Sequence, residues 1–390
     1  MSRGITAGID VGTYEVRVIV TQQNEESSLP TILGTGRAES KGLRHGYIIN
    51  TSDVTKSVNV ALAQAEKSSG TKIKRVFISI GGVGLSGINS QGSTIISRAD
   101  QEVTENDVEQ ALSVAEESIP NTVLQNRKII YTIPTGWKID GKQVMGRVLG
   151  MKGVKLETKA LFVSCIEPHL DDLVLAVEKT GVEVIDVVAS PIAASFVTLS
   201  KSQKIAGCVL ANIGAETVSI VVFEDNIPIS LEVFPIGGSD ITNDIALGLK
   251  VSLEEAEAIK LGGVTSTSYS RKKLEEIVSA RLGDIFELIE AHLKKIGKSG
   301  VLPAGIIITG GSSSIGIIED LARSFLRLPS RIASINTGNE KFQMKDSSWS
   351  VAYGLCIMGN LPDEEERLGL KTYGSNLFKK SFQILKRFLP

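Results

Sequence analysis

Cysteines, aromatic residues and long apolar runs are all scarce in this chain of 390 residues. Its three cysteines, Cys165, Cys208 and Cys356, lie far apart in apolar segments. This is typical of small buried side chains in a reducing compartment, not of a metal site or a disulfide framework. No apolar run approaches the ~20 residues that a spanning helix requires, and the chain starts without a signal-peptide pattern. We therefore expect a protein that stays in the cytoplasm.

Net charge is also small, because 42 Lys and Arg face 44 Asp and Glu, a balance of −2. The chain as a whole therefore lacks the excess of positive charge that is typical of proteins that bind nucleic acid. A chain of this length exceeds what one hydrophobic core usually serves, so two or more domains are expected. Local charge is uneven only near the end, where the acidic run 363–366 precedes a basic terminus.

Residues 4–20 hold the most informative local pattern. Two β-forming runs, Ile5–Ile9 and Val16–Val20, flank a tight bend at 10–13, which predicts a hairpin. Such a bend offers backbone N–H groups and the Thr13 hydroxyl to an anion, and Asp10 is placed to hold a hydrated cation beside it. An ordinary hairpin with a polar turn would explain this stretch equally well.

The pattern recurs at residues 207–223, with Asn212, Gly214 and Thr217 in the matching places. In each half a later strand ends in a glycine pair: 74–80 before Gly81-Gly82, and 304–309 before Gly310-Gly311. A duplication of this size predicts two related lobes.

Apolar periodicity predicts the remaining elements. In the first half we expect a strand at 31–37, helices at 53–67, 168–180 and 190–200, and a strand at 182–188. In the second half, helices are expected from about 238, at 253–260, at 271–295 and at 349–359. Residues 84–163 fall outside the duplication; they predict a small α+β insert with a helix around 107–115 and strands at 128–133, 143–149 and 155–164.

Two phosphate-gripping hairpins, one per half, resemble the superfamily of actin, heat-shock chaperone and sugar-kinase ATPases. The stretches 79–82, 89–92, 150–157 and 350–355 are similar to markers of the FtsA family of bacterial cell-division proteins. The insert also resembles that family's subdomain 1C in position, whereas rod-shape actins carry theirs in subdomain 1B. Residues 135–144 depart from the family, being short and only loosely like its proline-aspartate-glycine segment.

The resemblance implies an α/β, two-lobed actin-like ATPase fold with duplicated ribonuclease H-like lobes. Its subdomains would be 1A (1–83 and 164–202), 1C (84–163), 2A (203–242 and 303–361) and 2B (243–302). A flexible linker (362–375) and an amphipathic helix (376–390) would follow.

ATP and Mg²⁺ would bind between the lobes, with Asp10 holding the metal through water and no catalytic residue assigned. The implied nucleotide-binding residues are Asp10, Gly12, Thr13, Tyr14, Asn212, Gly214, Ala215, Glu216, Thr217, Gly237, Gly238, Glu257, Lys260, Gly310, Gly311 and Ser312. By spacing alone, Glu257 and Lys260 could equally form a solvated ion pair. Related folds have Asp at position 212 and a small residue at position 216, so we expect slow or negligible hydrolysis.

The family resemblance also implies partners. These are the C-terminal peptide of the tubulin-like FtsZ, other copies of the chain in polymers, and later division proteins docking on the 1C insert. We expect the acidic FtsZ peptide to meet the 2B insert through Arg281, Lys294 and Lys295. The alternative is that these cations only solvate a helix face.

The last residues, 375–390, predict an amphipathic helix. One arc is apolar and the other cationic, with Lys379 and Lys380 on the cationic arc and no acidic residue in the helix. It is too short to span a bilayer but can lie on an anionic one. The expected contacts are Leu377, Phe378, Phe382, Leu385, Lys386, Arg387, Phe388 and Leu389. This places the protein peripherally on the cytoplasmic side of the cell membrane, at the septum; a helix docked on the second lobe is the alternative.

Two other functions share the fold. A small-metabolite kinase needs a substrate cleft and a general base, and the hairpins offer no carboxylate beyond Asp10 and Glu216. The actin-like protein of type IV pili shares the insert but typically lacks the tail helix. The amphipathic terminus therefore favours the FtsA-like function over both.

Overall fold

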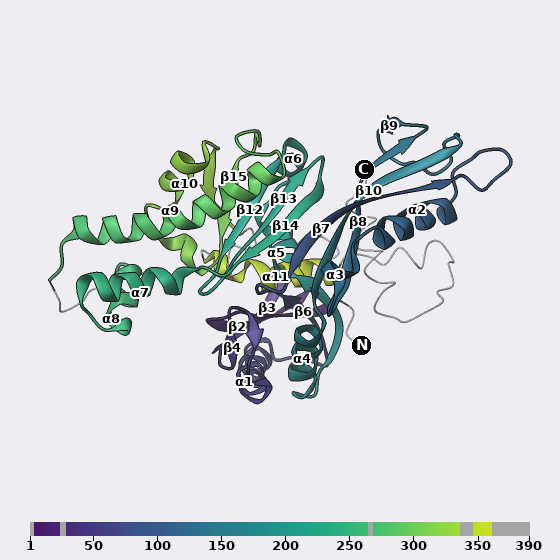
Figure 1. Cartoon of the computed structure of the whole chain (residues 1–390). Helices are drawn as coiled ribbons and strands as arrows, with labels where there is room; N and C mark the ends of the chain where they lie inside the picture. The colour runs from purple at the N-terminus through teal and green to yellow at the C-terminus, as the bar shows by residue number, and fades with distance from the viewer. Residues whose placement is uncertain (1–3, 24–28, 264–267, 336–345, 361–390) are drawn as a thin grey trace.

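The computed structural model describes residues 4–23, 29–263, 268–335 and 346–360. Its centre is a pair of five-stranded sheets with the same strand order and directions (Figure 1). The first contains β1 (Ile5–Val11), β2 (Glu15–Gln22), β3 (Thr31–Glu39), β6 (Arg75–Ile80) and β11 (Glu183–Ala189). The second contains β12 (Cys208–Ile213), β13 (Val218–Glu224), β14 (Ile227–Phe234), β15 (Ile306–Thr309) and β16 (Ser330–Ile332).

Within each sheet an antiparallel meander of the first three strands is continued by two parallel strands. In the first lobe β1 pairs antiparallel with β2 and parallel with β6; in the second, β12 pairs in the same way with β13 and β15. The predicted duplication into two lobes is therefore confirmed, and both predicted hairpins form.

The first lobe also contains helices α1 (Thr51–Ser69), α4 (Glu167–Glu178) and α5 (Ser190–Thr198), and a small hairpin of β4 (Leu43–Arg44) with β5 (Tyr47–Ile48). Helix α1 packs so closely on β3 that a Cβ at Gly36 would lie 1.9 Å from the Ala61 carbonyl oxygen. The predicted helix 190–200 was wrong at its end, because Ser200 caps a separate helix, α6 (Lys201–Ala206).

The insert forms its own layer, with the sheet order β7-β10-β8-β9 and helix α2 on one face. Its elements are β7 (Ser86–Ile95), α2 (Glu105–Glu117), α3 (Asn121–Leu124), β8 (Arg127–Ile139), β9 (Lys142–Val144) and β10 (Lys155–Ile166). The predicted strand 143–149 was wrong beyond Val144, and β7 was not predicted. Strand β7 is polar and rich in small residues. At Gly92 the missing side chain lets α2 pack closely, since a Cβ there would lie 2.2 Å from the Ala111 carbonyl oxygen.

The second lobe carries α7 (Gly238–Leu249), α8 (Leu253–Lys260), α9 (Arg271–Lys295) and α10 (Ile318–Leu326). Figure 1 shows α7, α8 and α9 at one end of the molecule and the insert at the other. The predicted range of the long helix, 271–295, is the range found.

The last described helix, α11 (Ser350–Asn360), corrects the sequence-based division, which put it in the second lobe. It packs against β1, β2 and α5 of the first lobe instead. A Cβ at Gly354 would lie 1.9 Å from the Ala193 carbonyl oxygen, and the Asn360 side chain hydrogen-bonds to Thr6 and Thr21. The duplicated order of elements does not indicate which sheet a terminal helix covers.

All three cysteines are buried free thiols, as predicted, and burial raises the pKa of each to about 12. Among the helices that the structure describes, none has the length and apolar character needed to cross a bilayer. The predicted linker and amphipathic helix, 362–390, lie outside the described residues.

Candidate functional site

A cleft of about 760 Å³ lies between the two lobes, lined by the hairpin bends and by the turn after β15. All but three of the expected nucleotide-binding residues line it. Those present are Asp10, Gly12, Thr13, Tyr14, Asn212, Gly214, Ala215, Thr217, Glu257, Lys260, Gly310, Gly311 and Ser312. Segments more than 300 positions apart in the sequence therefore meet at one place.

The two bends are built alike. In the first, the Gly12 N–H donates to the Glu15 carbonyl oxygen at 3.2 Å; in the second, the Gly214 N–H donates to that of Thr217 at 2.9 Å. Each bond closes a tight turn between antiparallel strands. The shared geometry explains why the same residue pattern recurs at both positions.

Asp10 is the second-to-last residue of β1 and lines the cleft. Its Oδ1 accepts a hydrogen bond of 2.7 Å from the Ser79 hydroxyl. Burial raises the pKa of Asp10, and the Ser79 hydrogen bond and the charge of Arg17 partly offset this effect. A carboxylate held in this way is suited to contact a metal through its water shell.

Gly310, between β15 and the short 3₁₀ helix η1 (Gly311–Ser314), has φ of +93°. A Cβ there would lie 2.5 Å from both the Asn212 Oδ1 and the Ile213 carbonyl oxygen. Only glycine fits this position, and it leaves bare backbone facing the cleft, as a flat aromatic base requires.

Glu216 is one of the three residues that do not line the cleft. Its carboxylate accepts a hydrogen bond of 2.5 Å from the backbone N–H of His45 in the other lobe, and its own N–H donates to the Thr13 hydroxyl at 3.3 Å. The charge therefore points away from the place where phosphates were expected.

Gly237 and Gly238 are the other two; the sequence placed them among the nucleotide-binding residues, but the backbone N–H groups at this N-terminus of α7 already have protein acceptors. The Gly238 and Ser239 N–H groups donate to the carbonyl oxygens of Gly214 and Ala215, at 2.9 and 2.7 Å. The Gly237 N–H donates to Asp240 Oδ2 at 2.8 Å. These glycines allow the helix to pack on the hairpin bend.

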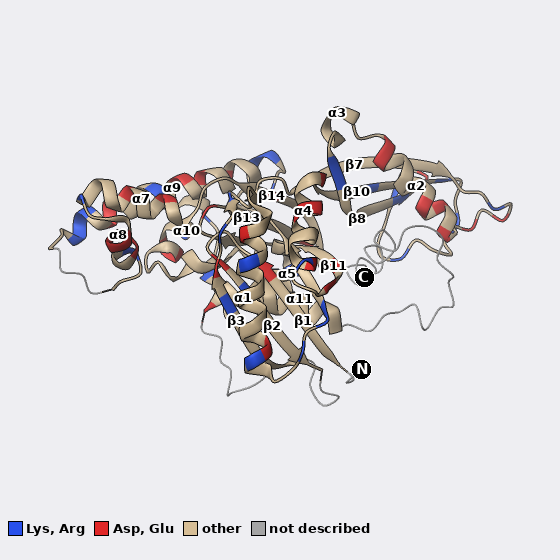
Figure 2. Cartoon of the chain, turned by 90° about the horizontal axis from the view of Figure 1, so that it is seen from below, with Lys and Arg blue, Asp and Glu red and all other residues tan. Residues whose placement is uncertain are grey.

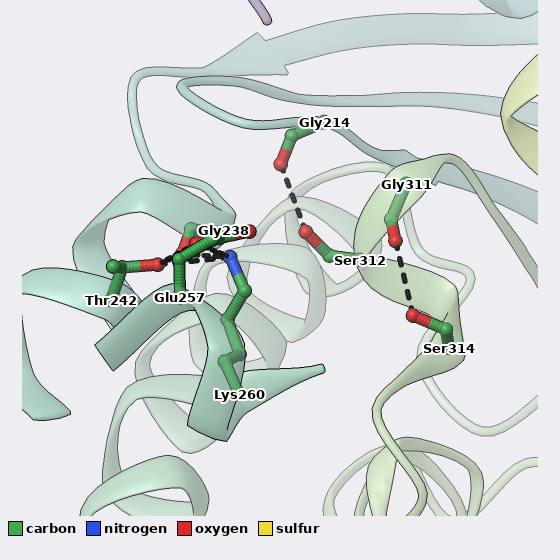
Figure 3. Close-up of polar contacts among 8 residues, drawn as sticks. All are labelled: Gly214, Gly238, Thr242, Glu257, Lys260, Gly311, Ser312 and Ser314. Atoms are coloured by element: carbon green, nitrogen blue, oxygen red, sulfur yellow. Dashed lines mark hydrogen bonds and ion pairs between the residues drawn. The ribbon is translucent and has the colours of Figure 1, made fainter. Parts of the chain in front are cut away.

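Lys260 and Glu257 form the ion pair that was the alternative to nucleotide binding, at 2.7 Å, but the pair is not a solvated one (Figure 3). The lysine side chain is only 7% exposed. Its ammonium also donates to the Thr242 hydroxyl at 2.9 Å and to the Gly238 carbonyl oxygen at 3.1 Å. The pair therefore braces α8 against α7 at the edge of the cleft.

Several cleft residues were missed from the sequence. A serine-rich wall faces the cleft, and Figure 3 shows Ser312 of this wall donating to the Gly214 carbonyl oxygen. Glu15 and Arg17 of β2 and Arg37 of β3 line the cleft, as does His169, whose pKa is lowered by burial. The available signal was the position of Arg17, a lone cation within the apolar run Val16–Val20.

The expected peptide-binding cations lie on α9, and none of them lines the cleft. Arg281 is already paired with Asp244, through contacts of 2.7 and 3.1 Å, and with Asp284 at 3.2 Å. Lys294 is 68% exposed and 3.5 Å from Glu290. Figure 2 shows cations and acids interspersed along this helix.

Two family models match the chain. "Cell division protein FtsA" matches residues 209–354, and "SHS2 domain inserted in FTSA" matches residues 82–164, almost the range of the predicted insert. Curated relatives named "Cell division protein FtsA" include that of Borreliella burgdorferi, 30% identical, with 98% of this chain and 96% of the relative covered. That of Pseudomonas aeruginosa is 28% identical, with 95% and 92% covered.

Solved structures share the fold at low sequence identity. The "PilM-PilN type IV pilus biogenesis complex" superposes with a TM-score of 0.67 at 15% identity, covering 92% of this chain and 99% of that one. "MreB5 of Spiroplasma citri bound to ADP" gives a TM-score of 0.54 at 13% identity, covering 94% and 99%. The two-lobed α/β fold expected from the sequence is thus confirmed.

Proposed function

The chain belongs to the FtsA family of cell-division proteins, and from this premise we propose that it is an ATP-binding adaptor of the division machinery. It binds Mg²⁺-ATP in the cleft, assembles with its own copies into polymers, and tethers FtsZ to the cytoplasmic face of the cell membrane at the septum. Later division proteins would dock on the 1C insert, residues 84–163.

The observation that carries the proposal is the pair of matched bends facing one cleft, with the Gly310 turn between them. Thr13 and Thr217 offer hydroxyls, the bends offer amides, and Gly310 offers flat backbone for a base. Asp10 fits a metal held through water, and the described residues contain no cluster of three His, Cys, Asp or Glu side chains for direct coordination. Magnesium would supply charge neutralisation of the phosphates.

For the FtsZ peptide, the contacts on α9 favour binding at the C-terminal end of this helix over binding at its middle. Arg281 is already engaged by two carboxylates, whereas Lys294 and Lys295 are exposed. Charge reversal at Lys294 and Lys295 should weaken binding of an acidic peptide in a salt-dependent way. Reversal at Arg281 should instead lower the melting temperature, because it breaks the link between α7 and α9.

For the membrane, the proposal assigns the tail 376–390 as the anchor. The preceding helix α11 ends at Asn360, which is hydrogen-bonded to the start of the first sheet, so the anchor would leave from the first lobe. The FtsZ-binding end of α9 belongs to the other lobe. This separation is consistent with an adaptor that holds its two partners apart.

Co-sedimentation with anionic vesicles tests the whole proposal. The full chain should pellet with vesicles and carry an FtsZ C-terminal peptide with it. A truncation after Gly374, or the double variant F382E/L385E, should still bind ATP but remain in the supernatant. Undiminished vesicle binding by the truncation would remove the membrane anchor, and failure to retain the peptide would remove the tether.

A further inference from the structure

The insert is attached to the first lobe by more than its two chain connections. It follows β6 and is followed by α4, and the Arg127 side chain joins its two ends. The Arg127 guanidinium donates to the Gly84 carbonyl oxygen at 2.7 Å and to the Ser164 carbonyl oxygen at 3.1 Å. The Tyr131 hydroxyl of β8 donates to the Val187 carbonyl oxygen of β11 at 3.0 Å. The insert is therefore held as an extension of the first lobe.

The same insert also lies against the second lobe. Strand β7 is an edge of the insert sheet, β14 is an edge of the second-lobe sheet, and the two strands are in contact (Figure 1). Asn89 Nδ2 donates to the Ile229 carbonyl oxygen at 3.3 Å. The backbones come close at Gly87, where a Cβ would lie 3.0 Å from both the backbone N and the carbonyl oxygen of Leu231. We call this contact between β7 and β14 the seam.

Strand β14 connects the seam to the cleft. Its residues Leu231 and Val233 belong to the same hydrophobic core as Leu161 of the insert, whereas Ile229 and Phe234 pack against the core of the second lobe. Strand β14 pairs with β13, which begins directly after the bend at 214–217. The seam is therefore one strand away from a bend that lines the cleft.

The cleft and the seam depend on the same arrangement of the lobes. A nucleotide in the cleft would contact both lobes, because one bend comes from each. The insert contacts both lobes as well, through its attachment to the first and the seam on the second. Two interactions that need one arrangement stabilise each other, because the free energy of fixing that arrangement is required only once.

We propose that the insert is a clasp between the lobes, so that closure of the seam and occupancy of the cleft by nucleotide reinforce each other. This rests on the proposed nucleotide site and adds a regulation of that site through residues 84–163, none of which lines the cleft. The coupling is reciprocal. A partner that lifts the insert from β14 weakens nucleotide binding, and a partner that holds it there strengthens nucleotide binding.

A matched pair of glycine substitutions in the insert sheet tests the clasp. Gly87→Ala places a Cβ against the Leu231 backbone and forces the seam apart. Gly136→Ala, on β8, is the control, because no protein atom lies within 4 Å of its Cβ position. In calorimetric titration of the full chain with ATP and magnesium, G87A should bind roughly fivefold more weakly or worse, the lower end of ordinary coupling between two sites. G136A should bind as wild type does.

Hydrogen–deuterium exchange supplies a readout that a purely structural role of Gly87 would not change. In wild type and G136A, ATP should slow exchange in residues 86–95 and 227–234, although no residue of either segment lines the cleft. In G87A this slowing should be smaller. If G87A only loosened the insert, exchange would rise throughout residues 84–163 while ATP affinity stayed at the wild-type value, and the clasp would be refuted.

The outcomes distinguish the nucleotide site from the clasp. If wild type binds no ATP, the proposed nucleotide site fails, and the clasp fails with it. If wild type binds ATP and G87A binds it equally well, the site stands and only the clasp is overturned. If G87A does not fold, N89A decides, because it removes the hydrogen bond to Ile229 without adding an atom. N89A should bind ATP about two- to threefold more weakly, the effect of one modest hydrogen bond, and wild-type affinity in N89A would overturn the clasp.

Discussion

The Glu216 carboxylate in the second lobe accepts a hydrogen bond from the backbone N–H of His45 in the first, across 171 positions of sequence. His45 has a positive φ of 47°, and its neighbour Gly46 lies against Gly82, so this loop is closely packed. The Glu216 side chain therefore links the two lobes, although Glu216 itself does not line the cleft.

Breaking that link should loosen the cleft. We expect E216A to release a bound fluorescent ATP analogue roughly 3- to 10-fold faster than wild type, the effect of about one net hydrogen bond. Stopped-flow displacement measures the rate. E39Q, which alters an exposed glutamate 3.3 Å from Lys41, is the control. An unchanged release rate in E216A would show that the link does not restrain the lobes.

Gly310 and Gly311 offer a matched pair of substitutions. Gly310→Ala should lower the free energy of unfolding by roughly 1–3 kcal/mol and abolish ATP binding, because φ is +93° and the new Cβ would strike Asn212 and Ile213. Gly311→Ala should leave the free energy of unfolding unchanged, since no protein atom lies within 4 Å of its Cβ position. Thermal melting and calorimetry on both variants check this. Equal effects would refute the geometric account of the turn.

The sequence predicted those helices and hairpins that are determined by the residues within them. The helix at 271–295 follows from its own periodicity, and both hairpins follow from β-forming runs around a tight bend. Strand β7 was missed because its residues are polar and small; its strand character comes from pairing with apolar β10. The placement of α11 on the first lobe was missed for a similar reason, since packing across 300 positions leaves no local signal.

At the site, the backbone positions were predictable but the directions of charged side chains were not. The positive φ at position 310 requires glycine, and a glycine is visible in the sequence. Glu216 turns toward His45, and the amides of Gly238 and Ser239 bind carbonyl oxygens, because of neighbours supplied by other segments. Spacing alone could not distinguish Arg17, with an unsatisfied N–H, from Lys260, with three partners.

Stability should fall at mildly acidic pH because of His292 on α9. Burial lowers its pKa from 6.5 to about 4, and its Nε2 lies 2.7 Å from the Ser230 hydroxyl. Between pH 6.5 and 4, His292 is therefore protonated in the unfolded chain but neutral in the folded chain. The resulting stability is complete above pH 6.5 and is lost as pH falls toward 4, on the order of 1–3 kcal/mol.

The measurement is the free energy of unfolding against pH for wild type and H292Q. The wild-type slope between pH 6.5 and 4 should be steeper than that of H292Q. Glu232, 3.7 Å from His292, has a pKa raised by burial, which acts in the opposite direction, so the difference between the two proteins is the informative quantity. Parallel curves would show that His292 does not contribute.

Hydrolysis should be slow, because every acidic side chain that lines the described cleft already has a protein partner. Asp10 accepts from Ser79, Glu15 pairs with Arg17, Glu257 pairs with Lys260, and Asp346 accepts from the Ser348 N–H. Each of these partners stabilises the charged form of the carboxylate and so weakens it as a general base for an attacking water. We expect turnover well below ~1 s⁻¹ in a phosphate-release assay, and N212D should make ATP affinity more dependent on magnesium without reaching metabolic rates. Turnover of ~1 s⁻¹ or faster in wild type, abolished by D10A, would contradict the view of this protein as a nucleotide-binding scaffold.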